Sequence, residues 1–257
     1  MIYKTLDIKD YRNGLLKDYI SQSTLKARDD DDDFGFKNSW VGSVVHRILE
    51  LGDKHIKSIR AEFVNQEAVD GLANERLKAD RDPEHLFDNC ITMATSVLRD
   101  IDIFDDIKSA YYDKSSMREV SMTTEYAGLK MKCRPDFISA DGSLVIDWKT
   151  TSDIENFERS IWKYMYDVQA YFYSMVTCEN FSDPFAEEKI LPQFMFFVVD
   201  KKRFKTGVYR MSPESMETGH KRLDSAIVKY KQYKAGEIWT ATDNEIKTVN
   251  PPRYLEV

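Results

Sequence analysis

The most constraining feature of this sequence is a short apolar run that ends in charged residues. Leu144 to Ile146 is followed directly by Asp147, Trp148 and Lys149, and a bounded apolar run of this kind predicts a buried β-strand. Side chains alternate between the two faces of a strand, so Asp147 and Lys149 should project to one side and Trp148 into the opposite layer. The strand therefore predicts a sheet on which a carboxylate and an ammonium group share one face.

A second acidic residue precedes this strand at the spacing of a hairpin. The only Pro-Asp pair of the chain, Pro135-Asp136, ends eleven residues before Asp147. The turn residues Ala140 to Ser143 predict that the chain folds back between them, which brings Asp136 beside Asp147. Two such carboxylates suit a hard divalent cation such as Mg²⁺, which takes oxygen ligands, water and substrate phosphate. Lys149 is then free to assist an attacking water.

The Asp-x-Lys spacing is not informative by itself, because an acid followed two residues later by lysine also occurs elsewhere in the chain. The other copies begin at Asp7, Asp106, Glu187, Asp200 and Glu245. The copy at Asp147 differs in its context, since it ends an apolar strand, follows the Pro-Asp pair and precedes Thr150-Thr151.

Length and composition favour a single domain over residues 1–257. Apolar residues make up 42% of the chain, which is enough to bury a substantial core. Within this domain four parts are expected: an irregular segment with short helices at 1–39, a helical part at 40–112, the sheet and a closing helix at 113–236, and an extended tail at 237–257.

Cysteine usage and hydropathy favour a cytoplasmic protein. Cys90, Cys133 and Cys178 are odd in number and widely spaced, which argues against a disulfide framework, a zinc site or an iron-sulfur site. No apolar run approaches the roughly 18 residues of a membrane span, so no membrane partner is expected. The net charge of −7 argues against a protein that coats nucleic acid by bulk electrostatics, but it allows basic residues clustered along a phosphate backbone.

The first long helix is expected from Trp40 to Asp53. Five aliphatic residues fall on one of its faces: Val41, Val44, Val45, Ile48 and Leu49. His46 lies between them, and it is either a hydrogen-bonded core residue or a ligand. Two further helices are expected, one from Glu62 to Leu77 and one that begins at Asp82-Pro83-Glu84 and runs through Leu98.

Two strands are expected before the Asp147 strand. Residues 118–126 are rich in β-branched side chains and end at Ala127-Gly128, which predicts a hairpin turn. Glu119 opens this strand, and it is either an exposed strand residue or a further acid of the site. On the partner strand one face would carry a row of charged groups, which either follows a phosphate backbone or is merely solvated: Lys130, Lys132, Arg134 and Asp136.

The C-terminal half predicts a helix, a hairpin and a closing helix. The aromatic-rich segment Ile161 to Val176 should be one helix, on which Gln169 and Tyr173 are stacked four residues apart. Gln193 to Asp200 and Lys205 to Met211 should form a strand pair, followed by a helix from Ser212-Pro213 to about Tyr233.

Several cations outside these strands are candidate phosphate contacts, with a plain surface role as the alternative. They are Lys201, Lys202 and Arg203 at the hairpin tip, and Arg28 before the acidic run Asp29–Asp33. That run is expected to be a solvated loop.

Taken together, these patterns resemble a known family. Pro135-Asp136 with Asp147-x-Lys149 resembles the PD-(D/E)xK nuclease superfamily, and Gly42-x-x-x-His46 and Gln169-x-x-x-Tyr173 resemble its RecB-type members. With Ser21-Gln22-Ser23-x-Leu25 and the closing segment 217–239, the order is most similar to the phage and prophage RecE (exonuclease VIII) type. The resemblance implies an α/β fold with an αβββαβ core, in which helices flank a central mixed sheet.

The resemblance also implies a reaction and its residues. It implies a DNA exonuclease that hydrolyses phosphodiester bonds with one or two Mg²⁺ ions, for which Mn²⁺ could substitute. The implied metal ligands are His46, Asp136, Asp147 and the main-chain carbonyl of Trp148. The implied catalytic groups are Lys149, Asp136, Asp147, Glu119, Gln169 and Tyr173. Among these, Lys149 would orient or deprotonate the attacking water, Glu119 would assist through water, and Gln169 and Tyr173 would position water or phosphate.

Finally, the resemblance implies a biological setting. It implies 5′-to-3′ degradation of linear double-stranded DNA from its ends in a bacterial or phage-infected cell, leaving 3′ single strands. A single-strand annealing protein is the implied partner, and a ring-shaped homo-oligomer is the implied assembly.

Three other functions remain open at this stage. A site-specific endonuclease would use the same residues. A Cas4-like nuclease would need four cysteines for an iron-sulfur cluster, and three scattered cysteines argue against it. A catalytically inactive DNA-binding module is also compatible, although the complete set of acids and lysine argues against a decayed site.

Overall fold

The computed structural model describes residues 1–4, 8–26, 40–64, 83–183 and 189–235. Arg28, the Asp29–Asp33 run and the expected tail at 237–257 lie outside these residues, as does most of the helix expected at Glu62 to Leu77. What was expected of them stays a prediction.

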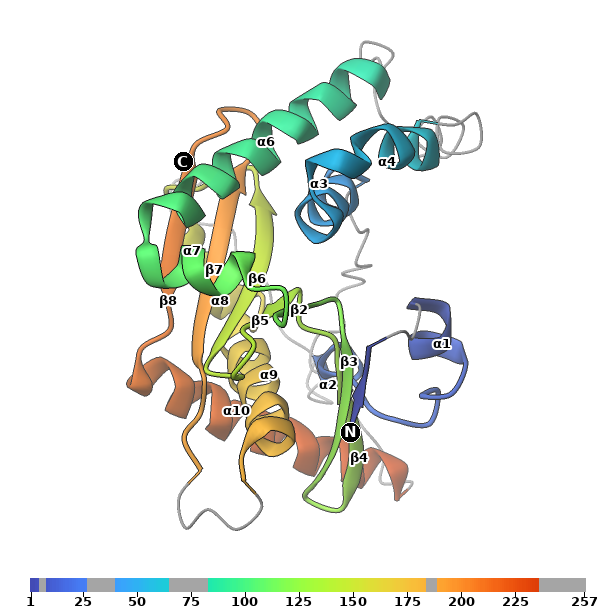
Figure 1. The fold of residues 1–257 in the computed structure, drawn as a ribbon. Coiled ribbons are helices and arrows are strands. Elements are labelled where there is room, and N and C mark those ends of the chain that lie inside the picture. Colours follow the sequence, from blue (N-terminus) through green and yellow to red (C-terminus); the bar gives the residue numbers. More distant parts are fainter. Residues whose placement is uncertain (5–7, 27–39, 65–82, 184–188, 236–257) are drawn as a thin grey trace, which may run out of the picture.

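A five-stranded mixed sheet forms the centre of the fold (Figure 1). Its strands, in spatial order, are β2 (Met117–Arg118), β5 (Phe137–Ile138), β6 (Leu144–Thr151), β7 (Gln193–Asp200) and β8 (Thr206–Arg210). β6 and β7 are parallel, and the other neighbours are antiparallel. The hairpin predicted before Asp147 is formed by β5 and β6, and Asp141 closes its turn by accepting hydrogen bonds from Ser139 Oγ and from the Ser143 N–H.

Helices cover both faces of this sheet, which confirms the predicted α/β class (Figure 1). One face receives Ile146 and Trp148 and is covered by α3 (Trp40–Leu51), α6 (Pro83–Ile103) and α7 (Asp105–Tyr112). The other face receives Val145 and Phe196 and is covered by α8 (Phe157–Lys163) and α9 (Tyr166–Phe181). The closing helix α10 (Pro213–Lys234) packs on α9. A 3₁₀ turn, η1 (Asp53–His55), and α4 (Ile56–Phe63) follow α3.

The aromatic segment that was expected to form one helix is two helices. α8 ends at Lys163 and α9 begins at Tyr166, and between them Met165 adopts a left-handed conformation with φ of 54°. A non-glycine residue in this region ends a helix, because its Cβ crowds the backbone if the turn continues. The chain therefore turns at Met165, and α9 starts in a new direction.

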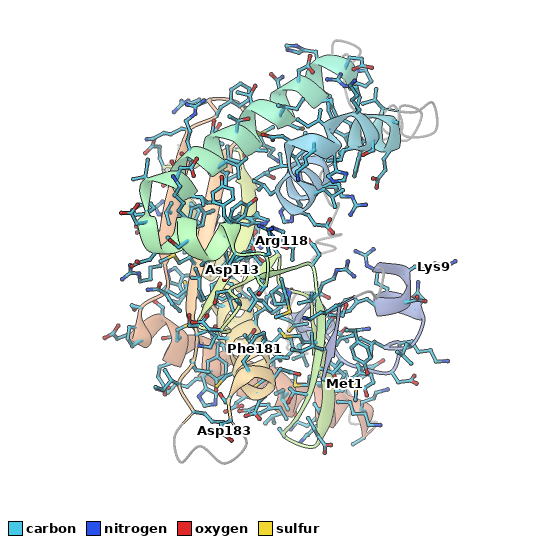
Figure 2. The ribbon with its side chains drawn as sticks, in the orientation of Figure 1. Met1, Lys9, Asp113, Arg118, Phe181 and Asp183 are labelled. Atoms are coloured by element: carbon cyan, nitrogen blue, oxygen red, sulfur yellow. The ribbon has the colours of Figure 1, made fainter. Side chains whose placement is uncertain are left out.

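A smaller, three-stranded sheet lies beside the main one. It consists of β1 (Ile2–Tyr3), β3 (Ser121–Tyr126) and β4 (Leu129–Cys133), with α1 (Ile8–Asn13) and α2 (Gln22–Lys26) next to it (Figure 1). The N-terminal ammonium group of Met1 donates a 2.9 Å hydrogen bond to the carbonyl of Thr123, which ties the start of the chain to β3 (Figure 2). Met122 and Met131 of this sheet are buried against α9, so the two sheets share that helix.

The hairpin that links the two sheets changes sheet in its middle. Arg118 pairs with Phe137 in the five-stranded sheet, whereas Met122 pairs with Cys133 in the three-stranded one. Arg118 marks the point where the hairpin enters the main sheet, and its guanidinium lies 4.5 Å from the centre of the Tyr111 ring on α7 (Figure 2).

Local conformation explains this break. Glu119 adopts φ of 51°, and Pro135, which stands opposite the next residue, Val120, has no N–H with which to continue the ladder. The prediction of one continuous strand over 118–126 is therefore wrong. The single face expected to run from Lys130 to Asp136 is likewise interrupted.

Lys132 binds main-chain carbonyl groups of the protein itself, whereas the sequence predicted a contact with phosphate. Its side chain points back to the N-terminal segment, where Nζ donates hydrogen bonds of 2.6 Å to the carbonyl of Tyr11 and 2.7 Å to that of Leu16. The residue is only 5% exposed, so it is not part of a solvent-facing row of cations. Lys130, by contrast, is exposed on the same strand.

None of the helices within the described ranges is long and apolar enough to cross a membrane.

We expect Lys132→Ala to lower the free energy of unfolding by about 1–3 kcal/mol, because it leaves the carbonyl groups of Tyr11 and Leu16, one partly buried and one buried, without their donor. Lys130→Ala is the matched control and should change stability by no more than about 0.5 kcal/mol. Urea unfolding followed by circular dichroism measures both. Equal, small effects of the two substitutions would show that the N-terminal segment does not depend on the Lys132 ammonium group.

Candidate active site

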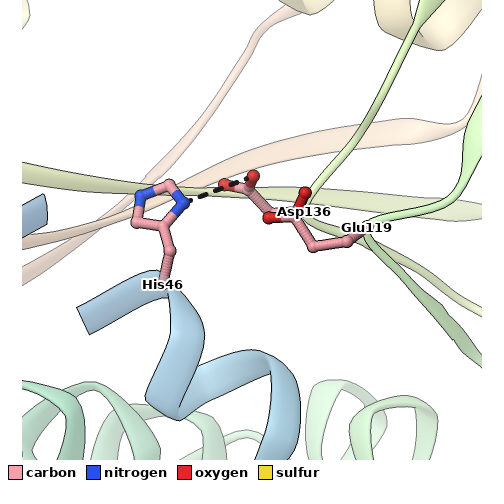
Figure 3. A group of neighbouring side chains, drawn as sticks. All are labelled: His46, Glu119 and Asp136. Atoms are coloured by element: carbon pink, nitrogen blue, oxygen red, sulfur yellow. Dashed lines mark ion pairs between the residues drawn. The ribbon is translucent and has the colours of Figure 1, made fainter. Parts of the chain in front are cut away.

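Three potential metal ligands converge where the hairpin changes sheet (Figure 3). Asp136 directly precedes β5, Glu119 directly follows β2, and a 3.2 Å hydrogen bond from the Glu119 N–H to the Asp136 carbonyl holds the two segments together. His46 reaches them from α3. One ligand atom from each of the three residues lies within 4.8 Å of the others.

Each ligand is oriented by a further contact. Nδ1 of His46 lies 3.4 Å from Oδ1 of Asp136, and Oδ2 of Asp136 accepts a 2.7 Å hydrogen bond from the Trp148 N–H. Nε of Arg134 donates a 3.0 Å hydrogen bond to Glu119. Arg134, which the sequence marked as a phosphate contact, is thus engaged with an acid of the site.

The electrostatics of this group show an excess of negative charge. Burial lowers the pKa of His46, but Asp136, together with Asp147 and Glu119, outweighs it and raises the pKa to about 9. Burial and the neighbouring Asp136 carboxylate raise the pKa of Glu119 to about 8. Burial opposes ionisation of Asp136 as well, yet His46 and Lys149 keep its pKa below the usual value. In the metal-free protein, His46 and Glu119 therefore carry protons near neutral pH, and these protons reduce the net negative charge of the group.

The donor set fits a small divalent cation. One ligand atom from each of the three residues lies within 4.8 Å of the others, so the three side chains face a common space that one ion could occupy. Two carboxylates and one imidazole suit Mg²⁺ or Mn²⁺, since carboxylates favour both ions.

Asp147 and Lys149 form a second charged group next to the first. They lie on the α9 face of β6, as the alternation of the strand predicts, and their side chains form an ion pair. Nε2 of Gln169 on α9 donates a 2.7 Å hydrogen bond to Oδ1 of Asp147. Burial raises the pKa of Asp147 to about 6 against the opposing effect of Lys149, while Asp147 keeps the pKa of Lys149 above its usual value although burial lowers it.

Asp147 is near the three-residue group but is not one of its members. Its carboxylate faces Lys149 and Gln169, whereas the group within 4.8 Å consists of His46, Glu119 and Asp136. The two groups are adjacent, because the Trp148 N–H that binds Asp136 belongs to the residue after Asp147. Within a strand the N–H and C=O of one residue point to the same edge, so the Trp148 carbonyl also faces the edge occupied by Asp136. A metal-binding role for Asp147 and for this carbonyl stays a prediction.

Tyr173 lies one helical turn after Gln169, as the spacing predicts. Burial raises the pKa of its hydroxyl well above the usual value, and Tyr11, Asp147 and Asp136 are close enough to add to the effect. Tyr11 itself comes from α1, and its hydroxyl lies 3.5 Å from the Lys132 carbonyl.

Two groups near the site, Tyr11 and Tyr166, were not expected there from the sequence. Tyr11 carried no signal, because its approach depends on how the N-terminal segment folds over β4. Tyr166, whose ring lies 4.8 Å from Nζ of Lys149, is three residues before Gln169, and that spacing on a helix is a usable signal.

The remaining candidate DNA contacts are surface groups. Lys202 and Arg203 are exposed in the turn between β7 and β8, where the Asp200 carboxylate accepts hydrogen bonds of 2.8 Å from the main-chain N–H of each. Lys201 is half-buried in the same turn. Contact of these residues, or of Lys130, with DNA stays a prediction.

Comparison with known proteins bears on this arrangement. A family model described as PDDEXK-like domain of unknown function (DUF3799) matches residues 36–250. One similar solved structure, described as "Putative exonuclease" from Eubacterium rectale, is 15% identical to this chain and has a TM-score of 0.61. The match covers 96% of this chain and 96% of that chain. Another, SSO0001, is 12% identical with a TM-score of 0.34, over 76% of this chain and 86% of that chain. No curated protein matches the sequence.

We expect Mn²⁺ to bind more tightly as the pH rises from 6 to 8. His46 and Glu119, with pKa values of about 9 and about 8 in the metal-free protein, carry protons in this range that the cation must displace. The apparent affinity should rise by up to about tenfold per pH unit for each proton displaced. Titration calorimetry in two buffers of different ionisation enthalpy measures both the affinity and the number of protons released.

Asp136→Asn is the matched variant, because it keeps the size of the side chain and removes its charge. It should weaken Mn²⁺ binding by at least about tenfold. An affinity that is independent of pH and unchanged in this variant would show that the ion binds elsewhere.

Proposed function

The chain belongs to the PDDEXK-like family DUF3799, within the PD-(D/E)xK nuclease superfamily, and from this premise we propose that it is a metal-dependent nuclease that hydrolyses DNA phosphodiester bonds. The observation that carries the proposal is the meeting of two groups at one sheet edge. One is the potential metal site of His46, Glu119 and Asp136, and the other is the ion pair of Asp147 and Lys149.

A bound divalent cation would polarise the scissile phosphate and lower the pKa of the attacking water. His46, Glu119 and Asp136 are the residues that would hold it, and Asp147 and the Trp148 carbonyl lie next to them on β6. The Trp148 N–H fixes the orientation of Asp136, so the chain presents the carboxylate in place before substrate binds.

Lys149 would act as a hydrogen-bond donor in this reaction. Its ammonium group stays protonated beside Asp147, so it is suited to orient the attacking water and to stabilise the negative charge that develops on the phosphate oxygens. Gln169 holds Asp147 from the other side and thereby fixes the direction of the ion pair. Tyr173, one turn further along α9, would help to position water or phosphate.

The finer features of the proposal come from the resemblance to RecE-type and RecB-type nucleases. They are exonuclease action on linear double-stranded DNA from its ends, 5′-to-3′ polarity, Mg²⁺ as the natural ion, and 3′ single strands passed to an annealing protein in recombination. A ring-shaped homo-oligomer belongs to the same proposal. These features are supported by the order of the motifs along the chain, which is Ser21 to Leu25, His46, Asp136, Asp147 with Lys149, and Gln169 with Tyr173.

The positions of the cysteines weigh against a Cas4-like cluster. The chain has three cysteines, and all are buried and free. Cys90 lies on the buried side of α6, whereas Cys133 lies in the core between the smaller sheet and α9. A cluster would need these thiols to converge, and they are built into separate parts of the interior.

We expect Lys149→Gln to reduce cleavage of linear plasmid by at least about 100-fold while the protein stays folded. Glutamine is preferred to alanine because its amide can still bind the buried Asp147 carboxylate, which would otherwise lose its partner. Lys205→Gln, at an exposed lysine paired with Glu155, is the control and should retain activity. Cleavage assays at matched Mg²⁺, with circular dichroism spectra, give the comparison; equal activity of Lys149→Gln and wild type would reject the assigned site.

Linear and covalently closed forms of one plasmid separate the exonuclease from the endonuclease. We expect Mg²⁺-dependent degradation of the linear form and no cutting of the circle, because an end-dependent enzyme has no place to start on closed DNA. Gel electrophoresis over time reads the result. Nicking or linearisation of the circle supports the endonuclease, and binding without cleavage of either form supports the inactive DNA-binding module.

A further inference from the structure

To orient an attacking water, the Lys149 ammonium group must point in one direction, and a lysine side chain does not do this unaided. Four rotatable bonds let its ammonium group sweep a wide volume unless neighbours restrict it. The side chain of Lys149 is 16% exposed, so packing limits it, and two aromatic rings lie near its end. Nζ is 4.8 Å from the centre of the Tyr166 ring and 5.6 Å from that of Phe196.

The two rings differ in their position in the fold. Phe196 is fully buried in β7, next to β6, and belongs to the hydrophobic core. Tyr166 is only half-buried and is the first residue of α9, directly after the left-handed Met165. Its place is thus set by the turn between α8 and α9 that the sequence did not predict.

The first turn of α9 contacts both members of the charged pair. Tyr166 lies against the ammonium group of Lys149, and Gln169, three residues later, binds the carboxylate of Asp147. Residues three apart on a helix lie on the same side, so one turn of helix can reach two neighbouring groups of one strand. Both contacts restrict the ion pair from the α9 face of the sheet, whereas α3, which carries the potential ligand His46, covers the opposite face.

We propose that Tyr166 is a positioning residue of the active site, whose ring face holds the Lys149 ammonium group in the direction that the reaction needs. This inference rests on the proposed function, since it gives Lys149 a role in hydrolysis. The ring face attracts a cation through its quadrupole, and the attraction is stronger where water is excluded. The ring face lies 4.8 Å from Nζ, so phenylalanine, which keeps the ring, should preserve this contact.

Three variants test this role. Tyr166→Leu removes the ring, Tyr166→Phe keeps it, and Tyr209→Leu is the control. Tyr209 belongs to the same aromatic cluster, with its ring 4.9 Å from Phe157 and its hydroxyl bonded to the Ile154 carbonyl. Its removal should therefore cost packing like that of Tyr166 without touching Lys149.

We expect Tyr166→Leu to lower kcat for linear duplex DNA by about tenfold, with KM and the Kd for Mn²⁺ changed by less than about threefold. Tyr166→Phe should retain the wild-type kcat, and Tyr209→Leu should lower Tm but not kcat. If Tyr166→Leu keeps full activity, or if Tyr209→Leu loses as much, Tyr166 contributes only packing and the inference is overturned.

A measurement that does not depend on activity separates this inference from the proposed function. In protein labelled with ¹³C-lysine, the Lys149 ε-methylene signal, assigned by its absence from Lys149→Gln, should be shifted by the ring current of Tyr166. The shift should persist in Tyr166→Phe and Tyr209→Leu and disappear in Tyr166→Leu. A signal that does not move in Tyr166→Leu refutes the contact, whereas a signal that moves in an enzyme that cleaves no DNA refutes the proposed function alone.

Discussion

Asp136 joins three separate parts of the chain through its carboxylate and its main-chain carbonyl. One of its oxygens lies 3.4 Å from His46 on α3, and the other accepts the Trp148 N–H of β6, while its own main-chain carbonyl binds the Glu119 N–H. A buried carboxylate is costly unless it is paired and hydrogen-bonded, so these contacts are the condition on which the local arrangement rests. The helix, the central strand and the hairpin can meet here only because Asp136 is satisfied from all three sides.

The break in the hairpin creates the site. If residues 117–138 formed one regular ladder, Glu119 and Asp136 would be ordinary strand residues with side chains fixed by alternation. The chain instead passes from one sheet to the other, with Glu119 at a positive φ and Pro135 without a donor. Departures from regular backbone are often found at functional sites, where the surrounding fold compensates for the strain. Here the strained residue is itself one of the three potential metal ligands.

Buried charges alone would not identify a catalytic site, because ion pairs that serve only the fold also occur. Asp167 and Arg222, which join α9 to α10 at 2.7 Å, are such a pair. The group at the sheet edge differs in that burial, with the neighbouring Asp136 adding to it, raises the pKa of Glu119 to about 8 and that of Asp147 to about 6. Several carboxyl groups with raised pKa values at one place are typical of a functional site, whereas the acid of a purely structural ion pair stays ionised.

The sequence by itself determined the strand that carries Asp147 and Lys149, the α3 helix that carries His46, and the spacing of Gln169 and Tyr173. These follow from local rules, since alternation, helical periodicity and turn chemistry act over a few residues.

Only the tertiary structure decided which of these residues meet. Lys132 turned inward to the carbonyls of the N-terminal segment, and Arg134 was drawn to Glu119. Tyr166 came to lie against Lys149 because α8 and α9 are separate helices. Such outcomes depend on groups distant in sequence competing for the same buried partners, and no pattern within a short window contains that competition.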